Sequence, residues 1–200
     1  MAATRAARTA ASIWLLGASA YVVCEAVAAA GKPGYRYVTD YISDLGTSAV
    51  MNVGAFAAHG LLFAAGAIVA VRAFPGAGRV TPAFLVAAAA NAVGNVLIAV
   101  FPSDPHGPVP LHIVGAGLAI LGGNLAALLA GVGARRIGLP RNYSRASIAL
   151  GGFGIGCLLV LPLFPVGFVE RGAVYPIIAW ELMTGVAILR YRAASSASSG

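Results

Sequence analysis

Long apolar runs alternate with short polar segments along the whole chain. Six of these runs are about as long as a helix needs to cross a hydrocarbon core, roughly 20 residues at a rise of about 1.5 Å per residue. Thr47, Ser48, Pro82 and Pro110 stand where helices are expected to begin. The predicted spans are 10–30, 49–71, 82–101, 111–132, 146–164 and 173–189.

This pattern predicts an all-α polytopic membrane protein, built as a single six-transmembrane-helix bundle over residues 1–192. The composition agrees, because 60% of the residues are hydrophobic and 10% are charged, whereas about 25% are charged in soluble domains. The first apolar run continues to Ala30, which is too long for a cleaved signal peptide, so we expect it to remain as an anchor. Residues 193–200 are small and polar and are predicted to form a disordered tail.

The basic residues indicate orientation. They give a net charge of +7, but they lie at the ends of apolar runs rather than in one patch, so no nucleic acid is expected as a partner. Ten of the thirteen fall in the N-terminus, the C-terminus and the loops 72–81 and 133–145, and the alternate loops hold the other three. Because Lys and Arg mark the cytoplasmic side, both termini are expected in the cytoplasm, with the bundle in the cell membrane.

Acidic residues and imidazoles gather on the predicted outer side. The segment 33–46 holds three of the seven tyrosines and two of the six acidic residues. His106 lies in the next outer loop, and Glu170 precedes Arg171 just before the sixth span. We expect a ligand-binding pocket here, with loop hydrogen bonds, helix caps and anchoring of the sixth span as the alternative. The candidate ligand-binding residues are Ser43, Asp44, Asp104, His112, Glu170 and Arg171.

Polar side chains also occur inside the predicted spans, where an unpaired ionisable group costs about 2.5 to 3.5 kcal/mol or more. His59 and Glu181 lie at similar depth and could pair. Asn52 and His59 are seven residues apart, so an α-helix would place them on one face. These groups predict either a hydrated core or hydrogen bonds that fix the helix packing. The set comprises Glu25, Asn52, His59, Asn91, Asn95 and Glu181.

Carboxylates and imidazoles together are the parts of a metal hydrolase site. Asp44, His106 and His112 are the candidates, but the chain has three histidines and no HExxH spacing, so we assign no metal and no particular cofactor is indicated. Cys24 and Cys157 lie in apolar runs and are expected to be free thiols.

Glycines in the predicted fourth and fifth spans indicate close helix packing. Gly152 and Gly156 are four residues apart, which is a small-xxx-small spacing. Such spacing lets two helix backbones approach each other. We therefore expect this pair to face a neighbouring helix.

The chain resembles the prokaryotic integral membrane family called domain of unknown function 998. The resemblance rests on Tyr41-Ile-Ser-Asp-Leu-Gly46, on Phe101-Pro-x-Asp104 followed by His112, and on Gly167-Phe-Val-Glu-Arg171 followed by Trp180. These landmarks occur in order over residues 10–190, and the resemblance implies six spans and a membrane location without an established activity. The first string is also similar to a motif of the eukaryotic Frag, DRAM and Sfk membrane proteins, several of which are linked to lipid handling.

We therefore expect a lipid-associated membrane protein that binds a lipid headgroup or a small polar ligand in an outer-face pocket. One alternative is an intramembrane lipid hydrolase or transferase, in which Asp44, His106 and His112 bind a metal or act as general acid and base. Two others are a small proton-coupled transporter that uses the intramembrane acids and His59, and a structural subunit of a membrane complex. Membrane lipids are the expected partners, and a protein partner or a homo-oligomer is compatible with each alternative.

Overall fold

Every regular element in the described part of the chain is a helix. The computed structural model describes residues 2–103, 110–160 and 163–197, apart from the side chains of residues 2–4 and 191–197. The elements are α1 (Ala2–Ala30), the 3-10 helix η1 (Ser43–Thr47), the π-helix η2 (Val50–Ala57), α2 (Ala58–Ala73), α3 (Val80–Val100), α4 (Pro110–Arg136), α5 (Arg141–Leu159) and α6 (Val166–Ala197). The all-α prediction is confirmed.

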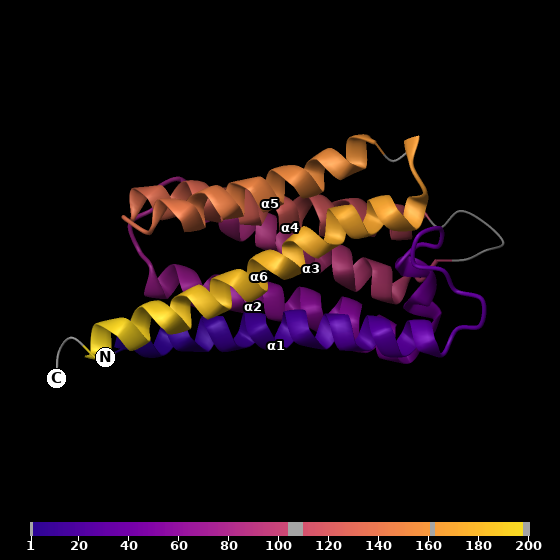
Figure 1. The fold of residues 1–200 in the computed structure, drawn as a ribbon, viewed down its shortest axis with the longest axis horizontal. Coiled ribbons are helices and arrows are strands. Elements are labelled where there is room, and N and C mark those ends of the chain that lie inside the picture. Colours follow the sequence, from indigo (N-terminus) through magenta and orange to yellow (C-terminus); the bar gives the residue numbers. More distant parts are fainter. Residues whose placement is uncertain (1, 104–109, 161–162, 198–200) are drawn as a thin grey trace.

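The long helices lie side by side as one elongated bundle, with the N- and C-termini at the same end (Figure 1). We call this the arginine end, since residues 72–79 and 135–145 also lie there and carry six arginines. We call the opposite end the acidic end; there the connection 31–49 joins α1 to η2, and α6 begins. α3 packs most extensively against α4, and α1 packs against both α2 and α6.

Five helical segments of the described chain are long and apolar enough to cross a membrane. Large apolar side chains on the outside of the bundle, such as Leu16 and Val86, are well exposed, as is expected where lipid replaces water. α5 is not among the five, and it begins at Arg141 rather than at the predicted residue 146. The five segments are Arg5–Ala30, Val50–Ala73, Val80–Val100, Pro110–Arg136 and Val166–Arg190.

An aromatic cluster joins four helices in the middle of the bundle. The ring of Trp180 on α6 lies 5.1 Å from that of Trp14 on α1, measured between centroids, and 5.8 Å from that of Phe63 on α2. Phe84 on α3 approaches the same indole at 6.3 Å. All four side chains are buried, and tilted or edge-to-face contacts of this kind add to the energy of burial.

The prediction that Gly152 and Gly156 face a neighbouring helix is wrong, because other glycines of α5 make the contact with α4. A Cβ atom on Gly152 or Gly156 would meet nothing within 4 Å, so these glycines face away from the bundle. Gly151 and Gly154 face α4 instead, and a Cβ on Gly151 would lie 2.4 Å from the carbonyl oxygen of Asn124. The spacing rule identifies a face of the helix but does not say which of several glycine-containing faces meets a partner.

Two helix details also differ from the prediction. The second span begins with the π-helix η2, in which the hydrogen bonds join residues i and i+5, so Asn52 and His59 do not keep the α-helical register that would place them on one face. Asn52 bonds to α3, whereas His59 bonds to α6. At the C-terminus α6 continues to Ala197, past the predicted start of the tail at residue 193.

Candidate functional site

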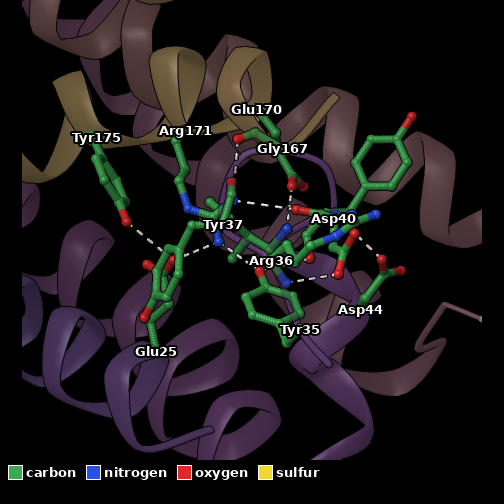
Figure 2. A network of polar contacts seen from close by, with 12 residues as sticks. Glu25, Tyr35, Arg36, Tyr37, Asp40, Asp44, Gly167, Glu170, Arg171 and Tyr175 are labelled. Atoms are coloured by element: carbon green, nitrogen blue, oxygen red, sulfur yellow. Dashed lines mark hydrogen bonds and ion pairs between the residues drawn. The ribbon is translucent and has the colours of Figure 1, made fainter. Parts of the chain in front are cut away.

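The connection between α1 and η2 folds back onto the first turns of α6 at the acidic end (Figure 2). Gly34 has a φ of +76°, a value that glycine adopts without strain, and it begins the turn. The carboxylate of Asp40 then accepts hydrogen bonds from the backbone N–H of Arg36, at 2.8 Å, and from the hydroxyl of Thr39, at 2.9 Å. These two bonds lower the pKa of Asp40, so the turn is held by an ionised side chain.

Arg171 joins this connection to α6. Its Nη1 donates to the backbone carbonyls of Tyr37, at 2.6 Å, and Asp40, at 3.2 Å, and to that of Gly167 within α6, at 3.1 Å. The guanidinium carbon also lies 4.5 Å from the centroid of the Tyr37 ring, within the range of a cation–π contact. The planar guanidinium thus closes the connection onto α6.

The other terminal nitrogen of Arg171 reaches α1. Nη2 donates to the carboxylate of Glu25 at 3.0 Å and to the hydroxyl of Tyr35 at 2.5 Å. Tyr175 donates to the same Glu25 oxygen at 3.0 Å. Arg171 and Glu25 are both buried, so they form an internal ion pair. We call Glu25, Tyr35, Tyr37, Arg171 and Tyr175 the Arg171 anchor.

Tyr35 is a protonated member of the Arg171 anchor. Its hydroxyl donates to the carbonyl of Tyr41 at 3.0 Å while it accepts the bond from Arg171. Burial raises the pKa of Tyr35 to about 12 and outweighs the lowering by the nearby guanidinium. The phenol therefore keeps its proton over the physiological range and can make both bonds.

The structure explains why the Gly-Phe-Val-Glu-Arg string begins with a glycine, Gly167. It lies one helical turn before Arg171 and faces the same connection. A Cβ atom at this position would lie 2.4 Å from the carbonyl oxygen of Asp40 and 2.6 Å from that of Tyr37. These are the two carbonyls that Arg171 binds, so the glycine makes room for the connection and the arginine holds it.

The Tyr41–Gly46 string docks beside this anchor. The Glu170 carboxylate accepts the backbone N–H of Ile42, and the Ser103 hydroxyl donates to the carbonyl of Ser43 at 3.1 Å. Asp44 accepts the N–H of Tyr41 through its own carboxylate, at 3.2 Å, and Lys32 donates to its carbonyl at 2.7 Å. The polar atoms of both motifs thus hold the connection in place.

The predicted outer-face set is therefore only partly assembled. Ser43, Asp44, Glu170 and Arg171 come together at the acidic end, but through backbone and side-chain contacts within the protein. His112 bonds to the carbonyl of Phe101 at 2.8 Å, and Asp104 and His106 lie outside the described residues. Across the described chain, no three His, Cys, Asp or Glu side chains gather in a way that could hold a metal ion.

Within the spans, the pairing expected from depth is present. His59 Nε2 lies 2.7 Å from a carboxylate oxygen of Glu181. Asn91 donates to the carbonyl of Ala119 on α4, and Asn52 to that of Ala99 on α3, both at 2.7 Å. These amides hold neighbouring helices together, as the packing interpretation expects.

An apolar cavity of about 480 Å³ lies at the arginine end, and the sequence did not predict it. All six long helices contribute to its wall. It extends from the Trp14 and Trp180 indoles, past small residues such as Ala130 and Gly133 of α4, to Asn142 at the start of α5. Which small side chains of α4 lie opposite the indoles is set by the packing of the helices and cannot be read from the sequence.

A family model described as "Protein of unknown function (DUF998)" matches residues 15–187 of this chain. The chain belongs to that family. No curated protein and no solved structure matches it.

The matched region of this DUF998 protein runs from within α1 to within α6. It includes the whole Arg171 anchor and the residues that line the apolar cavity, except Trp14 and Ile188. The family description carries no activity, so the function of this DUF998 protein is inferred from the geometry of its two ends.

Proposed function

We propose that this protein is a six-pass bundle of the cell membrane that binds an anionic phospholipid at its arginine end, with both termini in the cytoplasm. One acyl chain occupies the apolar cavity, and the phosphate lies among the arginines at the end of α4 and the start of α5. The observation that carries this proposal is an apolar cavity, built by all six long helices, beside the arginine-rich end of α4 and start of α5.

The cavity has the size and lining of a ligand site. Its volume of about 480 Å³ falls within the roughly 300 to 1,000 Å³ of small-molecule sites, which are predominantly apolar with few polar groups. Tyr143 and Thr184 are among its few polar residues, and their hydroxyls bond to each other at 3.1 Å. Apolar cavities of this kind do not attract water, so a hydrocarbon chain suits this one.

Arginines flank the cavity at the end where a headgroup would lie. Nη1 of Arg136 donates, at 3.4 Å, to the carbonyl of Ala77, a residue of the cavity wall. Arg141 lies between Pro140 and Asn142, which also line the cavity. Both guanidinium side chains belong to exposed residues and match the geometry of a phosphate. Basic pockets between helices on the cytoplasmic side are typical sites for anionic lipids.

The acidic end supports a ligand less well. Both terminal nitrogens of Arg171 already bond to protein oxygens, and Glu170 bonds to the backbone of Ile42. A headgroup would have to displace these bonds. We therefore assign the Arg171 anchor to folding and the arginine end to lipid.

Native mass spectrometry of the purified protein tests the acyl-chain site. We expect more adducts with phosphatidylglycerol than with phosphatidylcholine of the same acyl chains. Ala187→Leu places three extra carbons in the cavity wall and should remove the phosphatidylglycerol adducts, whereas Val186→Leu, at a neighbouring exposed residue outside the wall, should retain them. Equal adducts in both variants would contradict the proposed site.

A second pair of variants tests the headgroup. Arg136→Gln should reduce the preference for phosphatidylglycerol over phosphatidylcholine, because one phosphate-facing guanidinium is lost. Arg8→Gln removes the same charge from an exposed position of α1 at the same end, away from the cavity wall, and should preserve the preference. If both variants reduced it equally, net charge rather than a built site would explain the selectivity.

A further inference from the structure

A second, smaller cavity lies between the Arg171 anchor and the centre of the bundle, and we call it the polar chamber. The volume that the centre of a water molecule can occupy in it is about 40 Å³. One water needs roughly 10 to 15 Å³, measured in the same way. The polar chamber therefore has room for about three waters. Its polar lining residues are Tyr21, Ser43, His59, Asn91, Asn95 and Glu170.

His59 lines the polar chamber, and two buried atoms of the His59–Glu181 pair lack a protein partner within the described chain. His59 uses Nε2 to contact Glu181, and its Nδ1 makes no hydrogen bond to any described residue. The second carboxylate oxygen of Glu181 is equally unpartnered within the described chain. Both side chains are more than nine-tenths buried. Since buried polar atoms are almost always bonded to protein or to water, water in the chamber is the expected partner of Nδ1.

The opposite end of the chamber lies at the acidic end of the bundle. Ile42, Ser43 and Glu170 form its wall there, and the Glu170 carboxylate is held by the Ile42 N–H. Tyr41, the residue before this wall, is exposed. Within the described chain, the chamber wall at Ile42 thus adjoins an exposed residue. On the opposite side, the rings of Phe63 and Trp180 pack next to His59, toward the arginine end.

The groups around the His59–Glu181 pair and along the chamber come from four of the long helices, α1, α3, α4 and α6. α1 contributes Tyr21, whose ring lies 5.2 Å from the imidazole, measured between centroids. α6 contributes Glu170, which lines the polar chamber. The chamber wall formed by α3 and α4 consists of asparagine and apolar side chains, such as Asn95. Among the described residues that line the chamber there is no Lys or Arg, and Arg171, outside the chamber, is paired with Glu25.

We infer that the polar chamber holds a short chain of water and that the His59–Glu181 pair is a proton-binding site reached through it from the acidic end. His59 presents Nε2–H to the Glu181 carboxylate, which leaves a lone pair on Nδ1 of the neutral ring. A hydronium ion in the chamber gives its proton to that lone pair and becomes water. The ring gains one positive charge, which the Glu181 carboxylate balances. This inference does not depend on lipid binding at the arginine end.

Water-edited solid-state NMR tests this inference in lipid bilayers. The protein is labelled with ¹⁵N only in histidine, of which it has three, and the spectrum of His59→Gln assigns the His59 ring. We expect magnetisation from water to reach the His59 ring nitrogens, as it should reach those of His112 near a helix end. A His59 ring that receives no water magnetisation would overturn the inference.

A variant that fills the polar chamber tests whether water reaches His59 through the chamber or by another path. Ala116→Leu adds three carbons to the chamber wall and should abolish the transfer to His59, while His112 signals report that the fold is kept. Gly117→Ala is the matched control, because a Cβ there meets nothing within 4 Å. Transfer that persists in Ala116→Leu would show that water arrives elsewhere and would refute the chamber. Ala116→Val, a smaller addition, serves if the leucine variant does not fold.

Discussion

The Arg171 anchor should contribute more to stability than any other polar contact at the acidic end. Arg171→Met keeps an unbranched apolar stem but removes the guanidinium group and with it all hydrogen bonds of the side chain. Glu25 is 2% exposed and would lose its ion-pair partner, keeping only the bond from Tyr175. Removing one member of a buried ion pair costs about 3 to 5 kcal/mol, because the other charge stays buried without compensation.

A double-mutant cycle isolates the charge effect. Glu25→Gln removes the orphaned charge, so the double variant Glu25→Gln/Arg171→Met should be less destabilised than the sum of the two single variants. We expect a coupling energy of about 1 to 3 kcal/mol, the upper range for residues in direct contact. The remaining cost of Arg171→Met reflects the carbonyls of Tyr37 and Asp40, which lose their donor.

The assay is equilibrium unfolding in mixed detergent micelles, followed by circular dichroism and by proteolysis of the connection 31–49. Arg36→Gln is the matched control: it removes a positive charge from the same connection, but that side chain donates no hydrogen bond to the described residues. We expect it to change the free energy of unfolding by no more than about 0.5 kcal/mol. If Arg171→Met were no more destabilising than Arg36→Gln, the anchor would not have the role assigned to it.

Two further predictions concern packing and pH. Gly151→Ala should lower the melting temperature, because its Cβ would overlap a backbone oxygen of α4 and overpacking costs about 1 to 3 kcal/mol. Gly152→Ala is the control and should leave the melting temperature unchanged, because a Cβ there meets nothing within 4 Å. Equal effects of the two variants would contradict the contact between Gly151 and α4. Asp40 has a lowered pKa in the fold because of the Arg36 N–H and the Thr39 hydroxyl. Its contribution is therefore present above the unfolded pKa of about 3.9 and is lost as the pH falls through the lower folded pKa. Protease resistance of the connection should fall in that acidic range and should not do so in Asp40→Asn; the same acid dependence in both proteins would exclude this role.

Most of the helices could be predicted because five of the apolar runs are long enough to cross a hydrocarbon core, a constraint on length and composition. The boundaries were less predictable. α5 begins at Arg141 rather than at residue 146, because its helix extends beyond the apolar run into a polar first turn. The π-helix at Val50–Ala57 has no simple sequence pattern, and it changes which neighbour Asn52 contacts.

The candidate site was predictable in location but not in role. Glu170, Arg171 and the Tyr41–Gly46 string do meet at one end of the bundle. Their partners are largely backbone atoms, such as the carbonyls of Tyr37 and Asp40, and side-chain sequence patterns do not indicate backbone positions in a folded loop. Three tyrosines in the segment 33–46 were the one signal for the stacking partners of Arg171. The apolar cavity depends on how six helices tilt, which periodicity does not determine.

The most direct test of lipid binding is a cryo-electron microscopy structure, with a bound antibody fragment for size, in nanodiscs that contain phosphatidylglycerol and phosphatidylcholine. Our proposal predicts elongated density for an acyl chain that runs from the indoles of Trp14 and Trp180 to the α4–α5 connection, with phosphate density beside Arg136. A cavity that is empty or closed by helix movement, with lipid density only on the outer surface of the bundle, would contradict it.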